Sequence, residues 1–110
     1  MKAKVEVDAG ICGFRTTATV VSEDGQNVTF EIATDCEKLR GMAKLLKERE
    51  PVDAYQEIST AAESAVLGAA RAALKGCCAA CAAPVGIFKA MQVAAGLALP
   101  KDIGIRLAKE

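Results

Sequence analysis

The chain contains no histidine and no tryptophan, and its aromatic side chains are three phenylalanines and one tyrosine. Without histidine there is no Ser-His-Asp triad, no Cys-His nucleophile pair and no zinc–imidazole site. So few aromatic rings also argue against a platform on which bases would stack. The 14 basic and 14 acidic residues balance, so no net field attracts nucleic acid or anionic membranes. We therefore expect neither as a partner.

Long hydrophobic runs are also scarce. Residues 1–8 alternate between apolar and charged side chains, a pattern unlike that of a secretory signal. The run from Cys77 to Leu99 is apolar, but it is rich in alanine and glycine and contains Pro84 and Lys89, so a packed core helix is expected rather than a membrane span. With 110 residues, 52% of them apolar, the chain is predicted to form a single domain over residues 1–110 in the cytoplasm.

Three strand patterns open the chain. Residues 3–8 alternate between apolar and charged, and similar alternation predicts strands from Phe14 to Val21 and from Asn27 to Ala33. Glu23-Asp24-Gly25 is typical of a hairpin turn. The three strands are therefore expected to form an antiparallel meander.

Helical patterns follow. Thr34 and Glu37 have capping-box spacing, which predicts a helix that stops before Pro51. The same spacing at Thr60 and Glu63 predicts a second helix, running to about Lys75 with Gly76 just beyond its end. A third helix is expected to begin at Pro84 and to end near Leu99.

Alternation returns at Ile103, Ile105 and Leu107, which predicts a closing strand. The expected fold is therefore α+β, a three-stranded antiparallel meander plus a C-terminal strand, with three helices packed on one face. Between the helices the chain is acidic, and these carboxylates are expected to form a solvated face: Glu48, Glu50, Asp53 and Glu57.

Five cysteines are a high number for a chain of this length. The number is odd, and Cys77 and Cys78 are adjacent, which suits a disulfide framework badly. In a reducing compartment, clustered cysteines indicate metal or redox chemistry.

The predicted topology brings several of these cysteines together. Cys12 follows the first strand and Cys36 follows the third, so both lie where strands end at the same end of the meander. Cys36, in the first turn of a helix, and Cys81, just before another, would meet unpaired N–H groups and the positive helix end, which favour a thiolate. Gly10 and Gly13 would let the backbone approach a bound group closely and offer N–H groups to sulfur.

Cys78-Ala79-Ala80-Cys81 has the usual chelate spacing for two ligands on one centre. The predicted ligand set is Cys12, Cys36, Cys78 and Cys81, with Cys77 as the alternative to Cys78. For Cys77 a simple buried position is an equal alternative, since free cysteine is among the most buried residue types.

These ligands favour an iron–sulfur cluster, in first place a four-thiolate 4Fe–4S centre, in a non-enzymatic protein for electron transfer, cluster carriage or redox sensing. A redox or cluster-transfer protein would be its partner, and the chain could act as a homodimer or accessory subunit. Zinc in a structural interaction domain is the alternative, although such sites usually draw on two C-x-x-C pairs. Metal-free thiol redox chemistry at Cys78 and Cys81 is the third reading.

The chain resembles a family of small uncharacterised cysteine-containing proteins of anaerobic prokaryotes. The resemblance covers almost the whole chain and implies no established activity. It is carried by the stretch Val7–Phe14, Asp35-Cys36, the segment Cys81–Pro84 and the stretch Ala94–Pro100.

A looser similarity is to iron–sulfur scaffold proteins of the IscU/NifU amino-terminal type. Those proteins share the meander and have cysteines at the places of Cys12, Cys36 and Cys81, including a Cys-Gly pair like Cys12-Gly13. This resemblance implies cluster binding by the three residues. The chain departs from the scaffold pattern at Phe14, where the scaffold has aspartate, and at Ala80, where it has histidine.

Overall fold

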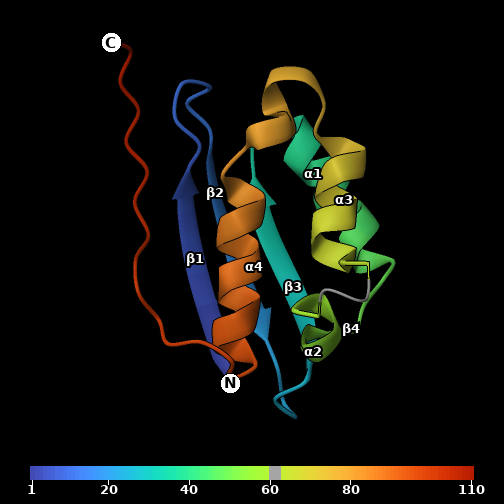
Figure 1. The fold of residues 1–110 in the computed structure, drawn as a ribbon. Helices are drawn as coiled ribbons and strands as arrows, with labels where there is room; N and C mark the ends of the chain where they lie inside the picture. The colour runs from blue at the N-terminus through green and yellow to red at the C-terminus, as the bar shows by residue number, and fades with distance from the viewer. Residues whose placement is uncertain (60–62) are drawn as a thin grey trace.

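The computed structural model describes residues 1–59 and 63–110. Three strands open the chain and four α-helices follow, with a short fourth strand after the first helix and one 3-10 helix, η1, before the last (Figure 1). The strands are β1 Lys2–Asp8, β2 Arg15–Val21, β3 Asn27–Thr34 and β4 Val52–Asp53; the helices are α1 Glu37–Lys47, α2 Ala54–Glu57, α3 Ala65–Ala73, η1 Gly76–Ala80 and α4 Ala83–Ala94.

The sheet is antiparallel throughout, with its strands in the order of the sequence. Val5 of β1 pairs with Ala18 of β2, which pairs with Ile32 of β3, so one apolar row crosses three strands. The helices cover this face, α4 against β1 and β2 and α1 against β3, with α3 packed on α1 and α4 (Figure 1). The α+β class, the meander and the helices on one face are confirmed.

The predicted C-terminal strand is wrong. Residues 99–110 have no regular secondary structure, and residues 101–110 are all exposed. The fourth strand is instead β4, which pairs with the start of β3 at the opposite edge of the sheet. Alternation predicts that one face of a segment is apolar, but pairing also requires a strand edge within hydrogen-bonding distance.

The predicted third helix is confirmed as α4, and its first turns lie very close to the sheet. Pro84 lies in the first turn of α4, which begins at Ala83 and ends at Ala94, before Leu99. A Cβ atom built on Gly86 would lie 2.5 Å from Val7 Cγ2 and 3.3 Å from Val5 Cγ2. Only glycine allows this approach, which fixes the start of α4 over the end of β1.

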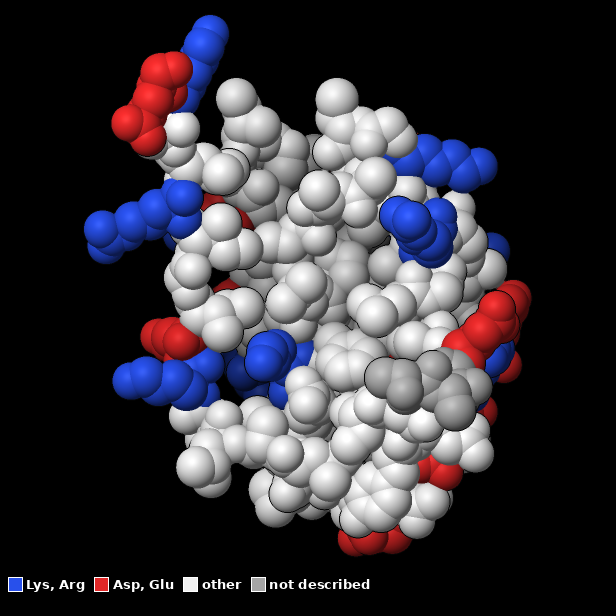
Figure 2. All heavy atoms as spheres, viewed as in Figure 1, with Lys and Arg blue, Asp and Glu red and all other residues white. Residues whose placement is uncertain are grey.

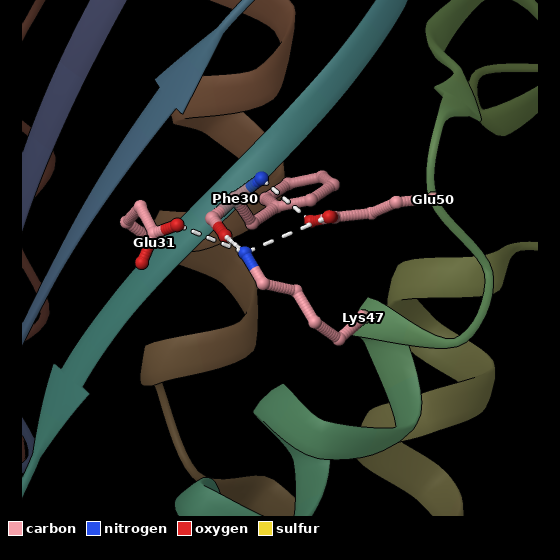
Figure 3. A network of polar contacts seen from close by, with 4 residues as sticks. All are labelled: Phe30, Glu31, Lys47 and Glu50. Carbon is pink, nitrogen blue, oxygen red and sulfur yellow. Dashed lines mark hydrogen bonds and ion pairs between the residues drawn. The ribbon is translucent and has the colours of Figure 1, made fainter.

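A polar network joins α1 to β3 beyond the short β3–β4 pairing (Figure 3). Phe30 N donates to Glu50 Oε1 at 2.7 Å, and Lys47 Nζ donates to the Phe30 carbonyl at 2.7 Å and to Glu31 Oε1 at 2.9 Å. The hydrogen bond with Glu31 raises the pKa of Lys47. The two side chains therefore satisfy backbone groups that no neighbouring strand reaches.

The predicted cap at Thr34 needs correction, and α3 has a cap that was not predicted. Cys36, not Thr34, is the N-cap of α1, and Thr34 Oγ1 instead accepts a hydrogen bond from Cys36 N at 3.2 Å. The N-cap of α3 is Ser64, whose hydroxyl accepts from Leu67 N, and α3 ends at Ala73 rather than Lys75. The predicted cap at Thr60 lies outside the described residues.

The apolar run is part of the folded unit. By length and composition alone, Gly76–Ala94 could cross a membrane. In the fold it is divided between η1 and α4, and the buried side of α4, with Ile87 and Met91 fully enclosed, lies on the sheet. The chain is thus a compact globular unit, as expected for a soluble protein.

We predict that the β2–β3 turn contributes stability that is lost in acid. The Asn27 side chain, followed by the Asn27 and Gln26 N–H groups, lowers the pKa of Asp24 to about 2. Because the folded pKa lies below the unfolded value, this stabilisation is present above about pH 4 and is lost as the pH falls towards 2. In chemical unfolding at a series of pH values, Asp24→Asn should unfold more easily at pH 6 and show a shallower loss between pH 4 and 2. An unchanged slope would contradict this assignment.

Candidate thiol site

Cys12 lies at the tip of the β1–β2 turn and is exposed. The turn closes through two backbone bonds, Gly13 N to the Gly10 carbonyl at 2.9 Å and Ala9 N to the Phe14 carbonyl at 3.2 Å. Gly10 and Gly13 have φ values of 93° and 77°, so the turn depends on glycine at both positions. No atom lies within 4 Å of a Cβ built on either, so the predicted role of both glycines, close backbone approach to a bound group, is sterically open.

Cys36 occupies the N-cap of α1 in an extended conformation, and its carbonyl accepts the first helical bond, from Arg40 N at 2.9 Å. Its side chain makes no capping hydrogen bond. It is half-buried and packs against the hydrophobic core. The sulfur therefore lies at the positive end of an 11-residue helix, close to the predicted first-turn position.

The other three cysteines lie in or directly after η1. Cys77 is exposed, whereas Cys78 and Cys81 are half-buried and pack against the core. Cys81 N donates to the Cys78 carbonyl at 3.1 Å, which closes the C-x-x-C into a tight turn. The exposure of Cys77 contradicts the reading that it is simply a buried core residue.

Contacts between elements place these three connections at one end of the fold. At this end of the sheet Asp8 pairs with Arg15, and Thr16 pairs with Thr34, two residues before Cys36. Lys38 Nζ donates to the Lys75 carbonyl at 3.2 Å, which joins the first turn of α1 to the residue before η1.

Gly86 against Val7 adds the start of α4 to the same end. Figure 1 shows the β1–β2 turn, the start of α1 and η1 gathered there, and this end of the face drawn in Figure 2 is mostly uncharged. We call it the cysteine end, defined by Cys12, Cys36, Cys77, Cys78 and Cys81.

The cysteine end is not a preformed metal centre. Among residues 1–59 and 63–110, no three Cys, Asp or Glu side chains are placed to hold a metal ion together. All five cysteines are free thiols. The predicted ligands Cys12, Cys36, Cys78 and Cys81 thus share one end of the fold without forming a ligand set as they stand. A four-thiolate centre would therefore require these connections to rearrange.

One feature of this end was not predicted from the sequence. Thr16 Oγ1 and Thr34 Oγ1 lie 3.0 Å apart, and Thr34 Oγ1 also accepts from Cys36 N. This chain of bonds fixes the backbone of Cys36 to the central strand. Cys36 is therefore anchored to the sheet, whereas Cys12 and Cys77 are exposed.

The fold and the cysteine end together define a small α+β protein that carries free thiols from three separate connections at one end. The chain belongs to a family described as a family of unknown function, DUF6951, which matches residues 3–107. Searches of the curated proteins and of the solved structures found no match.

Proposed function

We propose that this protein binds a thiophilic metal centre, in first place an iron–sulfur cluster, through Cys12, Cys36, Cys78 and Cys81. It would act as a non-enzymatic cluster carrier, redox sensor or electron-transfer protein in the cytoplasm, with a redox or cluster-transfer protein as its partner. The observation that carries the proposal is the gathering of all five free cysteines at one end, from three connections far apart in sequence.

The chemistry of the donors supports soft metals. The chain has no histidine, so thiolates are the only soft donors at this end apart from the thioethers of methionine. Cys36 lies at a helix N-terminus, where the dipole favours an anionic sulfur. The residues between and after Cys78 and Cys81 are alanines, which leave room beside the sulfurs for a group larger than a single ion.

Assembly of the ligands would accompany binding. Metal binding commonly orders a site that the free protein does not hold. Cys36, Cys78 and Cys81 already pack on the core, whereas Cys12 lies on an exposed glycine turn. Such a site suits cargo that is taken up and released.

A second function is favoured by one specific observation. The bond from Cys81 N to the Cys78 carbonyl forms an i to i+3 turn. In such a turn the two Cα atoms lie within about 7 Å of each other, close to the range that a disulfide spans. Cys78 and Cys81 could therefore act as a metal-free dithiol that is oxidised and reduced.

One preparation tests both functions. Protein purified without oxygen and reconstituted with iron and sulfide should be brown and hold about four iron and four sulfide per cluster. Colourless protein without iron would overturn the cluster proposal, and stoichiometric zinc would select the structural zinc alternative. If only the dithiol forms, mild oxidation should leave no metal and link Cys78 to Cys81, as peptide mass analysis would show.

Single replacements identify the ligands. Cys36→Ser and Cys81→Ser should each reduce retained iron several-fold, because serine is a poor ligand for iron in a cluster. Cys77→Ser and Cys78→Ser form a matched pair on adjacent residues, and the variant that loses the cluster names the fourth ligand. If all four variants retained iron equally, the cysteines would not be the ligands.

A further inference from the structure

The outer edge of β1 is open, because β1 ends the strand order and, among the residues that the structure describes, pairs with β2 alone. Ala9 N donates to the Phe14 carbonyl at one end of this pairing, and Ser22 N donates to the Met1 carbonyl at the other. Bonded and non-bonded pairs alternate in an antiparallel ladder, so the odd-numbered residues bond to β2. The even-numbered residues therefore direct their N–H and C=O groups outward: Lys2, Lys4, Glu6 and Asp8.

The C-terminal segment has the pattern of a strand but pairs with no strand among residues 1–59 and 63–110. Ile103, Ile105 and Leu107 are 55%, 68% and 95% exposed. No backbone hydrogen bond joins residues 98–110 to any part of the chain that the structure describes. In Figure 1 the segment leaves the body near the N-terminus and runs in the direction of β1, outside the sheet. Figure 2 shows charged side chains projecting outward along this margin. Exposed alternating apolar side chains are a liability unless something covers them.

One parallel register places all three apolar residues of the segment beside the half-buried apolar row of β1. With the two strands parallel, Ile103, Ile105 and Leu107 stand beside Ala3, Val5 and Val7, which are half-buried on the helix-covered face. On the other face Asp102 then stands beside Lys2, and Arg106 beside Glu6. Apolar and charged neighbours are both matched, as in stable sheets.

The antiparallel register that uses the same three apolar residues of β1 fails on charge. Keeping apolar beside apolar would place Ile103 next to Val7 and Leu107 next to Ala3. Asp102 would then face Asp8, and Arg106 would face Lys4. Like charges across adjacent strands destabilise a sheet, so the charge pattern selects the parallel register.

We infer that the segment Ile103–Leu107 of one chain adds as a parallel strand to the β1 edge of a second copy, and that two copies exchange these segments in a symmetric dimer. Each chain carries both the open edge and the strand that fits it, so one two-fold axis covers the β1 edges of both copies. Within one chain the segment stays unpaired beside its own edge. This inference does not rest on the proposed metal function.

Sedimentation equilibrium under reducing conditions tests the dimer. The full chain should have twice its chain mass of 11.4 kDa at micromolar concentration. A chain ending at Pro100 should be a monomer, and Ile105→Asp should raise the dimer Kd roughly 10³-fold, since each dimer buries two copies of the residue. A monomeric full chain, or a truncated chain that still dimerises, would overturn the inference.

A charge exchange tests both the register and the exchange between copies. Glu6→Arg places two arginines side by side, and Arg106→Glu places two glutamates, so each variant alone should dimerise roughly ten-fold or more weakly. Mixing the two variants restores both pairs, but only if the segment crosses to the other chain. The mixture should therefore form a heterodimer with nearly the original affinity. If mixing restores nothing, the segment does not pair with another copy in this register, and the inference fails.

Discussion

Gly86→Ala is expected to lower the free energy of unfolding by about 2–3 kcal/mol, which is large for the addition of one methyl group. The new Cβ would lie 2.5 Å from Val7 Cγ2 and 3.3 Å from Val5 Cγ2. Both neighbours are β-branched strand residues with restricted rotamers, so the start of α4 must move away from β1. That movement also displaces Cys81, five residues before Gly86. Urea unfolding followed by circular dichroism measures the loss.

The same substitution elsewhere should have the opposite effect. Gly68 lies in α3, is exposed, and has no atom within 4 Å of its would-be Cβ. Gly68→Ala should therefore stabilise the protein by about 0.5–1 kcal/mol through helix propensity alone. Adding Val7→Ala to Gly86→Ala removes the crowding methyl groups and should recover part of the loss. If both glycine variants behaved alike, the close packing of α4 on β1 would not matter to stability.

The sequence was sufficient to predict the elements that depend on local periodicity. Alternation in residues 3–33 correctly assigned the three long strands and the face each one buries. It failed for Ile103–Leu107, because the same alternation describes a strand whether or not the segment is hydrogen-bonded to a strand edge. β4 could not be predicted either, since two residues are too short for a period to show.

The sequence was sufficient to predict where the cysteines lie in the fold, but not how their sulfur atoms are arranged relative to one another. Antiparallel topology alone brings Cys12 and Cys36 to one end of the sheet, and the structure adds Cys77, Cys78 and Cys81 to that end. Distances between sulfur atoms depend on side-chain packing in turns, and the repeat of apolar residues along strands and helices carries no information about that packing. The expectation of four converged ligands therefore remains a proposal about the metal-bound protein.

The acidic stretch was predicted to be a solvated face, which holds for Glu48 but is wrong for Glu57. Glu57 is only 7% exposed. Its Oε1 accepts from Ser64 Oγ at 2.7 Å and from Val66 N at 2.9 Å, and its Oε2 accepts from Ala65 N at 2.6 Å. The partners lie seven to nine residues away, outside the three-residue spacing by which capping boxes are found. One carboxylate thus caps α3 from a separate helix, α2.

Glu57→Ala is accordingly expected to lower the free energy of unfolding by about 3 kcal/mol, because it leaves two buried N–H groups and a hydroxyl without an acceptor at a helix N-terminus. Glu57→Gln keeps one oxygen but turns an amide N–H₂ towards one donor, so about half the loss should remain. The exposed Glu63 lies beside the same helix end, and Glu63→Ala should change stability by less than about 0.5 kcal/mol. Equal losses at Glu57 and Glu63 would mean that general helix-end electrostatics, rather than this buried cap, starts α3. A loss confined to Glu57 would instead establish that its buried carboxylate, which links α2 to α3, stabilises the start of α3.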